Sequence, residues 1–266
     1  MFTEENKKGI VYTRSSLIRA THAFSTRIGG YSSGDFSSMN FGSDRGDKAE
    51  NVSRNYELWC REIFDVSADD ACVTRQVHGN TVKTVSAEDR HRCMEAVPYD
   101  ADGLVTAEKG LPIFCFTADC VPALLWDSEE HSAAAVHCGW KSSVADILKN
   151  TVSAMVALGT RTGQIHAALG PAIGKCCFET HSDVTDALAI YLDGDTEGLW
   201  DALPNGKYKV DLRMANARRL IQLGLRPENI DVSQECTCCL PEKYWSARYC
   251  AHNGFQRGSM CAGIML

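Results

Sequence analysis

Three side chains with metal-binding or nucleophilic chemistry stand near the ends of short apolar runs or beside glycine. His78 lies in RQVHGN, Cys120 in TADCVP and His137 in AVHCGW. Two imidazoles and one thiolate can hold a catalytic zinc ion and leave a fourth coordination position for water. The close ligand spacing of a zinc finger is absent, so distant segments would have to assemble the site. A lone histidine before a glycine is more often a turn or core residue, so spacing alone leaves both interpretations open.

The strands that must position these residues are predicted from apolar patterning. Alternation in TVKTV predicts a strand over 81–85. Four short strands are then expected in GLVT, PIFCFT, PALLW and SAAAVH. Later strands are expected in QIHAALG, IDVSQEC and the C-terminal GFQRGSMCAGIML.

Helices are predicted by apolar periodicity over 48–64, from Ser143 to Gly159, over 184–192 and over 212–223. Ser143 and Asp146 have the spacing of a capping box, with Asp in place of Glu. Residues 22–42 are rich in Gly and Ser and predict a loop rather than a regular element. Strand clusters mixed with helices predict an α+β (mixed α/β) fold of layered sheets, with residues 1–266 forming one domain.

Composition narrows the class of protein. The chain has 266 residues, of which 44% are hydrophobic, with a net charge of -7 and a pI near 5.6. An acidic chain is not expected to have nucleic acid or an acidic membrane as its main partner. No window of 18 apolar residues is present, and MFTEENKKGIVYTR lacks the apolar core of a signal peptide. We therefore expect a cytoplasmic protein.

Thirteen cysteines are many for such a chain. In the cytoplasm thiols stay reduced and serve as core residues, metal ligands or nucleophiles. We expect a structural role for Cys60, Cys72, Cys93, Cys115 and Cys261. The run CTCC, with Cys236, Cys238 and Cys239, is open to a second metal or to buried or redox-active thiols.

An ordered set of motifs carries a resemblance that covers residue 22 to the C-terminus. The motifs are QVHG, ADGLVT, TADC-P, H-GW, GP-IG, DL---N and CT…S-R. They resemble the YfiH or laccase-domain ("multicopper polyphenol oxidoreductase") family, which is described as purine nucleoside phosphorylases. The resemblance implies a four-layer α/β/β/α sandwich and zinc held by His78, Cys120 and His137. It also implies phosphorolysis of adenosine, inosine, guanosine and methylthioadenosine, and deamination of adenosine.

The resemblance also suggests residues for catalysis. Asp119, beside a predicted ligand, is a candidate proton shuttle or orienting group, or else only caps a turn. Lys141 is a candidate phosphate-binding residue where the family usually has arginine; its alternative role is a solvated surface charge. Because lysine lacks the bidentate fork of arginine, we expect weaker phosphate binding than the family norm and a lower phosphate KM in Lys141→Arg.

Three further residues are candidates for contact with the nucleoside. Arg27 and Asn40 match the N-terminal loop of the family and either touch the nucleoside or only shape a turn. Gln76 either binds substrate or supports a strand. Arginines usual in the family are replaced by Tyr56, Tyr249 and Ser259, which predicts a departure in substrate choice or rate.

Other functions are weighed against this one. Cys120 is a candidate nucleophile of a metal-free cysteine hydrolase, acting on amides such as cell-wall peptide precursors. A zinc ion that only holds strands together is a third hypothesis. Copper suits a set of two histidines and one cysteine, but the chain has no HxH pair for the cluster a laccase needs. The expected partners are a nucleoside and phosphate, with neither nucleic acid nor a membrane, and the chain is expected to be a monomer or weak homodimer.

Overall fold

Two stacked β-sheets form the centre of the protein, whose computed structural model describes residues 1–91, 94–95, 97 and 99–266. The first sheet has the order β1-β2-β3-β14-β6, with strands Phe2–Lys7, Ile10–Ser15, Thr21–Ser25, Met260–Met265 and Ile113–Thr117. The second has the order β13-β9-β7-β8-β5-β4, with strands Ile230–Val232, Ile165–Leu169, Val121–Asp127, Ala133–Cys138, Gly103–Thr106 and Val82–Thr84. A small third sheet has the order β10-β12-β11, with strands Glu179–Thr180, Tyr208–Val210 and Trp200–Ala202.

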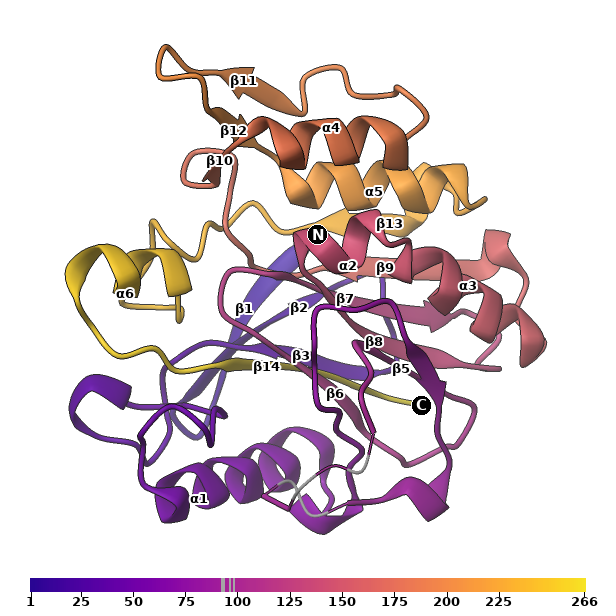
Figure 1. Cartoon of the computed structure of the whole chain (residues 1–266). Coiled ribbons are helices and arrows are strands. Elements are labelled where there is room, and N and C mark those ends of the chain that lie inside the picture. Colours follow the sequence, from indigo (N-terminus) through magenta and orange to yellow (C-terminus); the bar gives the residue numbers. More distant parts are fainter. Residues whose placement is uncertain (92–93, 96, 98) are drawn as a thin grey trace.

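Helices cover the outer faces of both large sheets, so the molecule has four layers (Figure 1). Helix α1, continued by one π-helical turn, packs on the first sheet, and α3, α4 and α5 pack on the second. The helices are α1 (Ala49–Trp59), the π turn (Cys60–Phe64), α2 (Trp140–Val144), α3 (Ile147–Ala157), α4 (Ser182–Tyr191), α5 (Leu212–Gln222) and α6 (Ala247–Asn253). The mixed α/β architecture expected from the sequence is confirmed.

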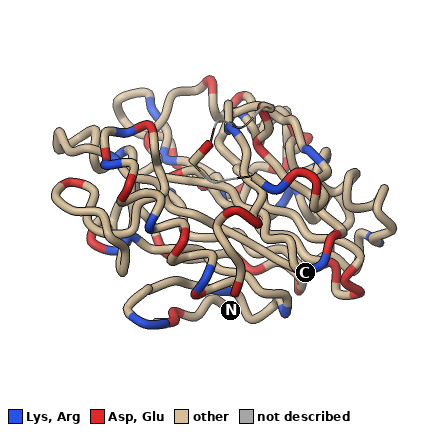
Figure 2. The backbone as a smooth tube through the Cα atoms, turned by 90° about the horizontal axis from the view of Figure 1, so that it is seen from below, with Lys and Arg blue, Asp and Glu red and all other residues tan. Residues whose placement is uncertain are grey.

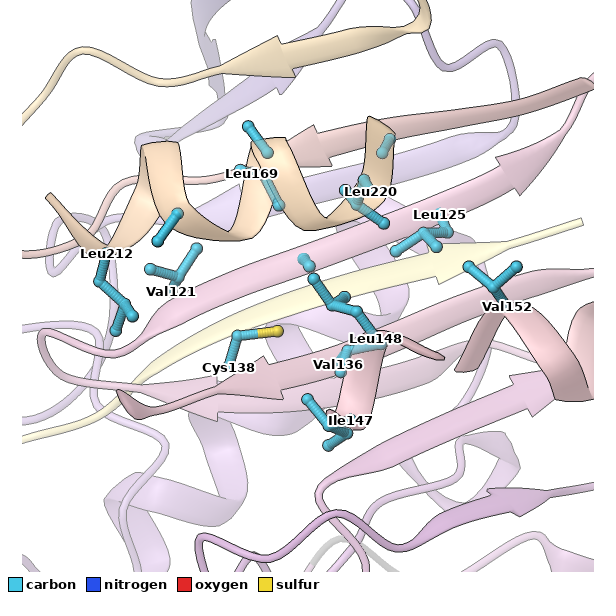
Figure 3. Packing of buried hydrophobic residues seen from close by; sticks show 14 of the residues in the cluster. Val121, Leu125, Val136, Cys138, Ile147, Leu148, Val152, Leu169, Leu212 and Leu220 are labelled. Atoms are coloured by element: carbon cyan, nitrogen blue, oxygen red, sulfur yellow. The ribbon is translucent and has the colours of Figure 1, made fainter. Parts of the chain in front are cut away.

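The alternation of side chains along each strand explains the layering. In β7, Val121 and Leu125 face the helices, whereas Leu124 and Trp126 face the other sheet. Every residue of β7 is buried, as expected of a strand covered on both faces. Figure 3 shows the core between α5, α3 and this sheet, where side chains from both elements interdigitate, among them Leu220, Leu148, Val136 and Leu169.

The predicted strands and helices agree with most of the observed elements. Each of the strands expected between 81 and 169 is present, and the helix expected over 212–223 begins after Asp211, whose carboxylate accepts a hydrogen bond from the Met214 N–H at 3.0 Å. The cysteines expected in the core are buried, at positions 60, 72, 115 and 261, while Cys93 lies outside the described residues. Within the described part of the chain, every helix is too short or too polar to cross a bilayer.

Two local predictions are wrong. Residues 22–42 are not entirely loop, because Thr21–Ser25 forms β3 and pairs with β14. The helix expected from Ser143 is broken: α2 ends at Val144 and α3 begins after Asp146, whose φ of 66° is left-handed. Asp146 therefore makes no side-chain cap and its carboxylate instead pairs with Arg219 of α5. Long-range pairing with other segments overrides the local pattern in both places.

A buried histidine in the first sheet makes stability depend on pH. His22 is 2% exposed; its Nε2 accepts a hydrogen bond from the Ser15 N–H at 3.0 Å, while its Nδ1 lies 2.9 Å from the Ala20 carbonyl oxygen. Burial lowers the pKa of His22 from 6.5 to about 4. Because the unfolded chain takes up the proton first as pH falls, stability is present above about pH 6.5 and is lost toward pH 4.

We expect the free energy of unfolding to fall by on the order of 3 kcal/mol between pH 7 and pH 4 through this residue alone. Urea unfolding of the wild type and of His22→Gln at several pH values measures the effect. The variant should lose this part of the pH dependence, and His252→Gln, at an exposed histidine, should retain it. If the free energy of unfolding changed equally with pH in the wild type and both variants, the prediction would be contradicted.

Candidate metal centre and adjoining cavity

The fold brings His78, Cys120 and His137 together. Their ligand atoms all lie within 4.8 Å of one another, with Cys120 Sγ 3.9 Å from His78 Nε2. Antiparallel pairing of β7 with β8 places Pro122 opposite His137, so the turn before β7 meets the end of β8. His137 is buried, Cys120 is half-buried and His78 is exposed. Within the described residues no further His, Cys, Asp or Glu joins this group, so a bound ion would keep an open position.

Asp102 holds two of these three residues in place. One carboxylate oxygen lies 2.7 Å from His137 Nδ1, which directs His137 Nε2 toward the group. The same carboxylate accepts hydrogen bonds from the backbone N–H groups of Val77, His78 and Gly79, at 3.1, 3.0 and 2.8 Å. These bonds support the left-handed backbone of His78, whose φ is 59°. Asp102 stands in ADGLVT, a motif noted in the sequence without a role for its aspartate.

Gly139 leaves the space in which the three residues meet. A Cβ atom at this position would lie 3.0 Å from His78 Cδ2 and 3.3 Å from Cys120 Sγ. We expect Gly139→Ala to weaken metal binding several-fold, because both side chains would have to shift. Titration with a chromophoric chelator competitor measures this loss. Gly79→Ala is the control, since its Cβ would meet nothing closer than 3.6 Å.

The electrostatics favour a thiolate at Cys120. Burial by itself would raise the pKa of the thiol, but hydrogen bonds from His137 and His78 outweigh it and lower this pKa to about 6. Burial likewise opposes the charged form of His137, yet its bonds to Asp102 and Cys120 raise the pKa of His137 to about 9. A soft thiolate beside two imidazoles fits a borderline divalent cation, and without a metal it is also a nucleophile.

A cavity of about 480 Å³ opens beside this group. His78, Cys120 and His137 form one part of its wall. Aromatic side chains form another part, contributed by Phe41, Tyr56 and Phe116. A volume of this size suits a small-molecule ligand with an apolar part and a polar part.

Three arginines also line the cavity, and sequence reasoning missed all of them. Arg45 is 3.2 Å from Asp44, and Arg75 pairs with Asp100. Arg257 differs, because none of the described residues forms a hydrogen bond or ion pair with its guanidinium. Burial, together with the nearby charge of Arg45, lowers the pKa of Arg257. Figure 2 shows Lys and Arg interspersed with Asp and Glu along the described chain, and the cavity wall likewise includes Asp44 and Glu95.

The residues after Arg257 fix its position. A Cβ atom on Gly258 would lie 2.4 Å from the ring of Trp245, so only glycine permits this close approach. The Ser259 N–H donates to Asn40 Oδ1 at 2.9 Å, and the Phe41 N–H donates to the Ser259 carbonyl oxygen at 3.0 Å. In the sequence, the feature that could have drawn attention to Arg257 is its neighbour Ser259, which stands where the family usually has an arginine.

Of the predicted substrate contacts, Gln76 lies on the cavity wall. Its amide exchanges two hydrogen bonds of 2.7 Å with the backbone of Phe116. Asn40 is fully buried and bonds to Gly42, Asp47 and Ser259. Asn40 is not among the residues that line the cavity.

Arg27 joins the N-terminal loop to the C-terminal loop. It donates hydrogen bonds to the carbonyl oxygens of Ser37 and Pro241, and its guanidinium carbon lies 3.6 Å from the centre of the Trp245 ring. Burial lowers the pKa of Arg27. Arg27 is likewise not among the cavity-lining residues, and both it and Asn40 shape the loops around Trp245.

Neither of the two predicted catalytic residues is among the residues that line the cavity. Asp119 is buried and its carboxylate accepts hydrogen bonds from the Thr237 hydroxyl at 2.6 Å and the Arg248 N–H at 2.7 Å. Lys141 is exposed in the first turn of α2, with its Nζ 5.7 Å from the centre of the Trp140 ring. Their catalytic roles stay predictions.

The fold and the site together define a four-layer mixed α/β protein with a group of two histidines and one cysteine beside a ligand-sized cavity. The family model described as "Multi-copper polyphenol oxidoreductase laccase" matches residues 21–266, and the chain belongs to this family.

Relatives and a solved structure agree with this assignment. A protein from Bacteroides thetaiotaomicron named purine nucleoside phosphorylase is 29% identical over 260 residues, which is 95% of this chain and 93% of the relative. A protein from an unknown prokaryotic organism named adenosine deaminase RL5 is 34% identical over 204 residues, covering 75% and 76% of the two chains. The crystal structure of YlmD from Geobacillus stearothermophilus superposes with a TM-score of 0.91 at 28% identity, covering 99% of this chain and 98% of that one.

Proposed function

We propose that the chain is a zinc-dependent purine nucleoside phosphorylase. Its substrates would be adenosine, inosine, guanosine and methylthioadenosine, and it would also deaminate adenosine. The observation that carries the proposal is that one cavity is lined both by the two-histidine, one-cysteine group and by the guanidinium of Arg257, which has no partner among the described residues. The names of the relatives, purine nucleoside phosphorylase and adenosine deaminase, support it. We place the protein in the cytoplasm, as a monomer or weak homodimer.

The ligand set supports zinc as the metal. Imidazole and thiolate are both good ligands for zinc, and three protein ligands with an open position are typical of its catalytic sites. A bound zinc ion would supply a Lewis acid to either reaction. We do not propose laccase chemistry, because it needs a second, histidine-rich copper cluster. Among the described residues the other group of potential ligands consists only of cysteines.

The walls of the cavity suit the two parts of the phosphorolysis reaction. A phosphate oxygen forms a bond to C1′ of the sugar as the bond from C1′ to purine N9 breaks. The proton of hydrogen phosphate ends on the purine, so the products are the sugar 1-phosphate (ribose 1-phosphate from adenosine, inosine and guanosine) and the free base. Arg257 would hold the phosphate through charge-assisted hydrogen bonds. The rings of Phe41 and Phe116 would pack against the base and exclude water, while Gln76 holds Phe116 in place.

Asp119 would contribute by positioning rather than by proton transfer. Both of its carboxylate oxygens are engaged, and it precedes Cys120 directly. In the deamination of adenosine, water adds to C6 of the base and the C6–N bond breaks, which releases ammonia and leaves inosine. We propose that this reaction uses the same cavity, with the base turned toward His78 and Cys120.

The test uses purified, metal-analysed protein incubated with adenosine, with and without phosphate, followed by chromatography of the products. We expect adenine and ribose 1-phosphate only when phosphate is present, and loss of both in His78→Ala. Inosine formed without phosphate would report deamination. A protein that binds zinc yet converts none of the named nucleosides would contradict the proposal.

A second candidate function rests on the same thiolate. Cys120 has a pKa lowered to about 6 and lies 3.9 Å from His78 Nε2, which also suits a metal-free cysteine hydrolase acting on amides, such as cell-wall peptide precursors. Inactivation by iodoacetamide that chelators do not reproduce would favour this function. Inactivation by chelators, reversed by zinc, would favour the phosphorylase.

A further inference from the structure

A second cluster of potential metal ligands lies apart from the cavity and is made only of thiols. The Sγ atoms of Cys176, Cys177, Cys236 and Cys239 all lie within 4.8 Å of one another. Cys239 Sγ is 3.5 Å from Cys176 Sγ and 3.3 Å from Cys177 Sγ. Cys176 and Cys239 are exposed, so an ion could reach the cluster from solvent, while Cys236 is buried.

The sheet explains why these residues meet although some sixty positions separate them in the chain. Strands β9 and β13 are parallel neighbours, so the segments that leave their carboxyl ends run side by side. An isolated bridge joins Ala172 to Cys236, and the Thr237 N–H donates to the Ala172 carbonyl oxygen at 3.1 Å. Each segment then turns and presents two cysteines to the other.

Gly174 lets the two turns approach closely. A Cβ atom there would lie 3.2 Å from both Cys176 Sγ and Cys236 Cβ. The Gly174 N–H also donates a hydrogen bond to Cys236 Sγ at 3.1 Å. Such an N–H···S contact stabilises a sulfur that carries negative charge. The turn therefore offers Cys236 Sγ a backbone donor that a thiolate ligand would use.

We propose that Cys176, Cys177, Cys236 and Cys239 bind one zinc ion as a structural tetrathiolate site. With zinc–sulfur bonds of about 2.3 Å, a tetrahedron places its sulfurs about 3.8 Å apart, so the observed separations need only small adjustments. Four sulfurs this close leave room for one ion, whereas an iron–sulfur cluster would put several atoms between them. Binding releases the thiol protons to solvent.

This second zinc ion would brace the candidate metal centre in the cavity. Thr237, between two of the cysteines in the chain, donates its hydroxyl to Asp119 at 2.6 Å. The Ile173 N–H, from the other turn, donates to the Asp119 carbonyl oxygen at 2.9 Å. Both turns thus hold the residue that precedes Cys120, and an ion joining the turns would limit the motion of that ligand.

Metal analysis of protein purified with a thiol reductant tests the proposal. We expect two zinc ions per wild-type chain, one in Cys239→Ser and one in His137→Ala. Cys238→Ser is the matched control, because Cys238 lies between two of the ligands but outside the group of four, and it should keep both ions. Loss of an ion in Cys238→Ser, or an ion count that Cys239→Ser leaves unchanged, would overturn the proposal. A single wild-type ion that is lost in Cys239→Ser but kept in His137→Ala would instead contradict the zinc site of the proposed function, on which the expected count of two rests.

Cobalt substitution gives a spectroscopic readout from the wild-type protein alone, so the test does not require every variant to fold. A tetrathiolate site has intense visible bands at longer wavelength than a site of two histidines and one cysteine, so wild-type protein loaded with two cobalt ions should show both sets. Cys239→Ser should lose the long-wavelength set only. Alkylation of the metal-replete protein under denaturing conditions shows which cysteines are free thiols. A disulfide among these four cysteines would overturn the proposal.

Discussion

Asp102→Asn is expected to lower the metal affinity of the group formed by His78, Cys120 and His137 by about 10- to 100-fold. The carboxylate fixes the ring of His137 through Nδ1 and also accepts three backbone N–H groups from the loop that carries His78. An amide keeps the shape of the side chain but loses the negative charge. The NH2 group of the amide would also face one of the N–H groups that now donate to the carboxylate. His78 and His137 should therefore become less well oriented.

Competition with a chelator of known affinity measures this loss, and activity toward adenosine should fall in parallel. Asp127→Asn is the matched control: Asp127 is also fully buried and lies 2.7 Å from the Nδ1 of a histidine, His131, at the far end of β7. Both variants should be destabilised, but only Asp102→Asn should release metal. Equal metal affinities in the two variants would show that Asp102 does not position the ligands.

Arg257→Gln is expected to raise the KM for phosphate by about 10- to 100-fold, which is the effect of losing charge-assisted hydrogen bonds worth about 1.5–3 kcal/mol. Arg257 lines the cavity, and its guanidinium has no partner among the described residues. Phosphate would occupy that position and lie between Arg257 and Arg45. The rate of any phosphate-independent deamination should change much less, because that reaction does not use the anion.

Initial rates at varied phosphate and saturating inosine measure this effect. Arg257→Lys should recover part of the affinity through its charge, and Arg161→Gln, at an exposed arginine paired with Glu129, should behave as wild type. Lys141→Gln separates the two candidate anion sites. A large rise in the phosphate KM for Lys141→Gln, with none for Arg257→Gln, would show that phosphate binds at Lys141, on the helix after His137, and not at Arg257.

Much of the architecture could be predicted from local patterns. Buried strands such as Val121–Asp127 appear as apolar runs, and α5 follows a capping aspartate, Asp211. The two wrong local predictions fall where contact with another segment determines the backbone conformation. Strand β3 exists because β14 pairs with it, and the break before α3 is held by Asp146, which pairs with Arg219.

The sequence by itself predicted the layered fold, because apolar periodicity is a property of adjacent residues. It predicted the three side chains of the candidate metal centre only through the resemblance carried by its ordered motifs, since their spacing alone left two interpretations open. Only the tertiary structure showed which groups Asp102 holds, that Arg257 lines the cavity and that the four clustered cysteines meet. Each of these depends on which strand ends become neighbours across long stretches of chain. Which strand ends become neighbours depends on the order and pairing of strands in the sheet, and the local sequence of one segment does not specify these.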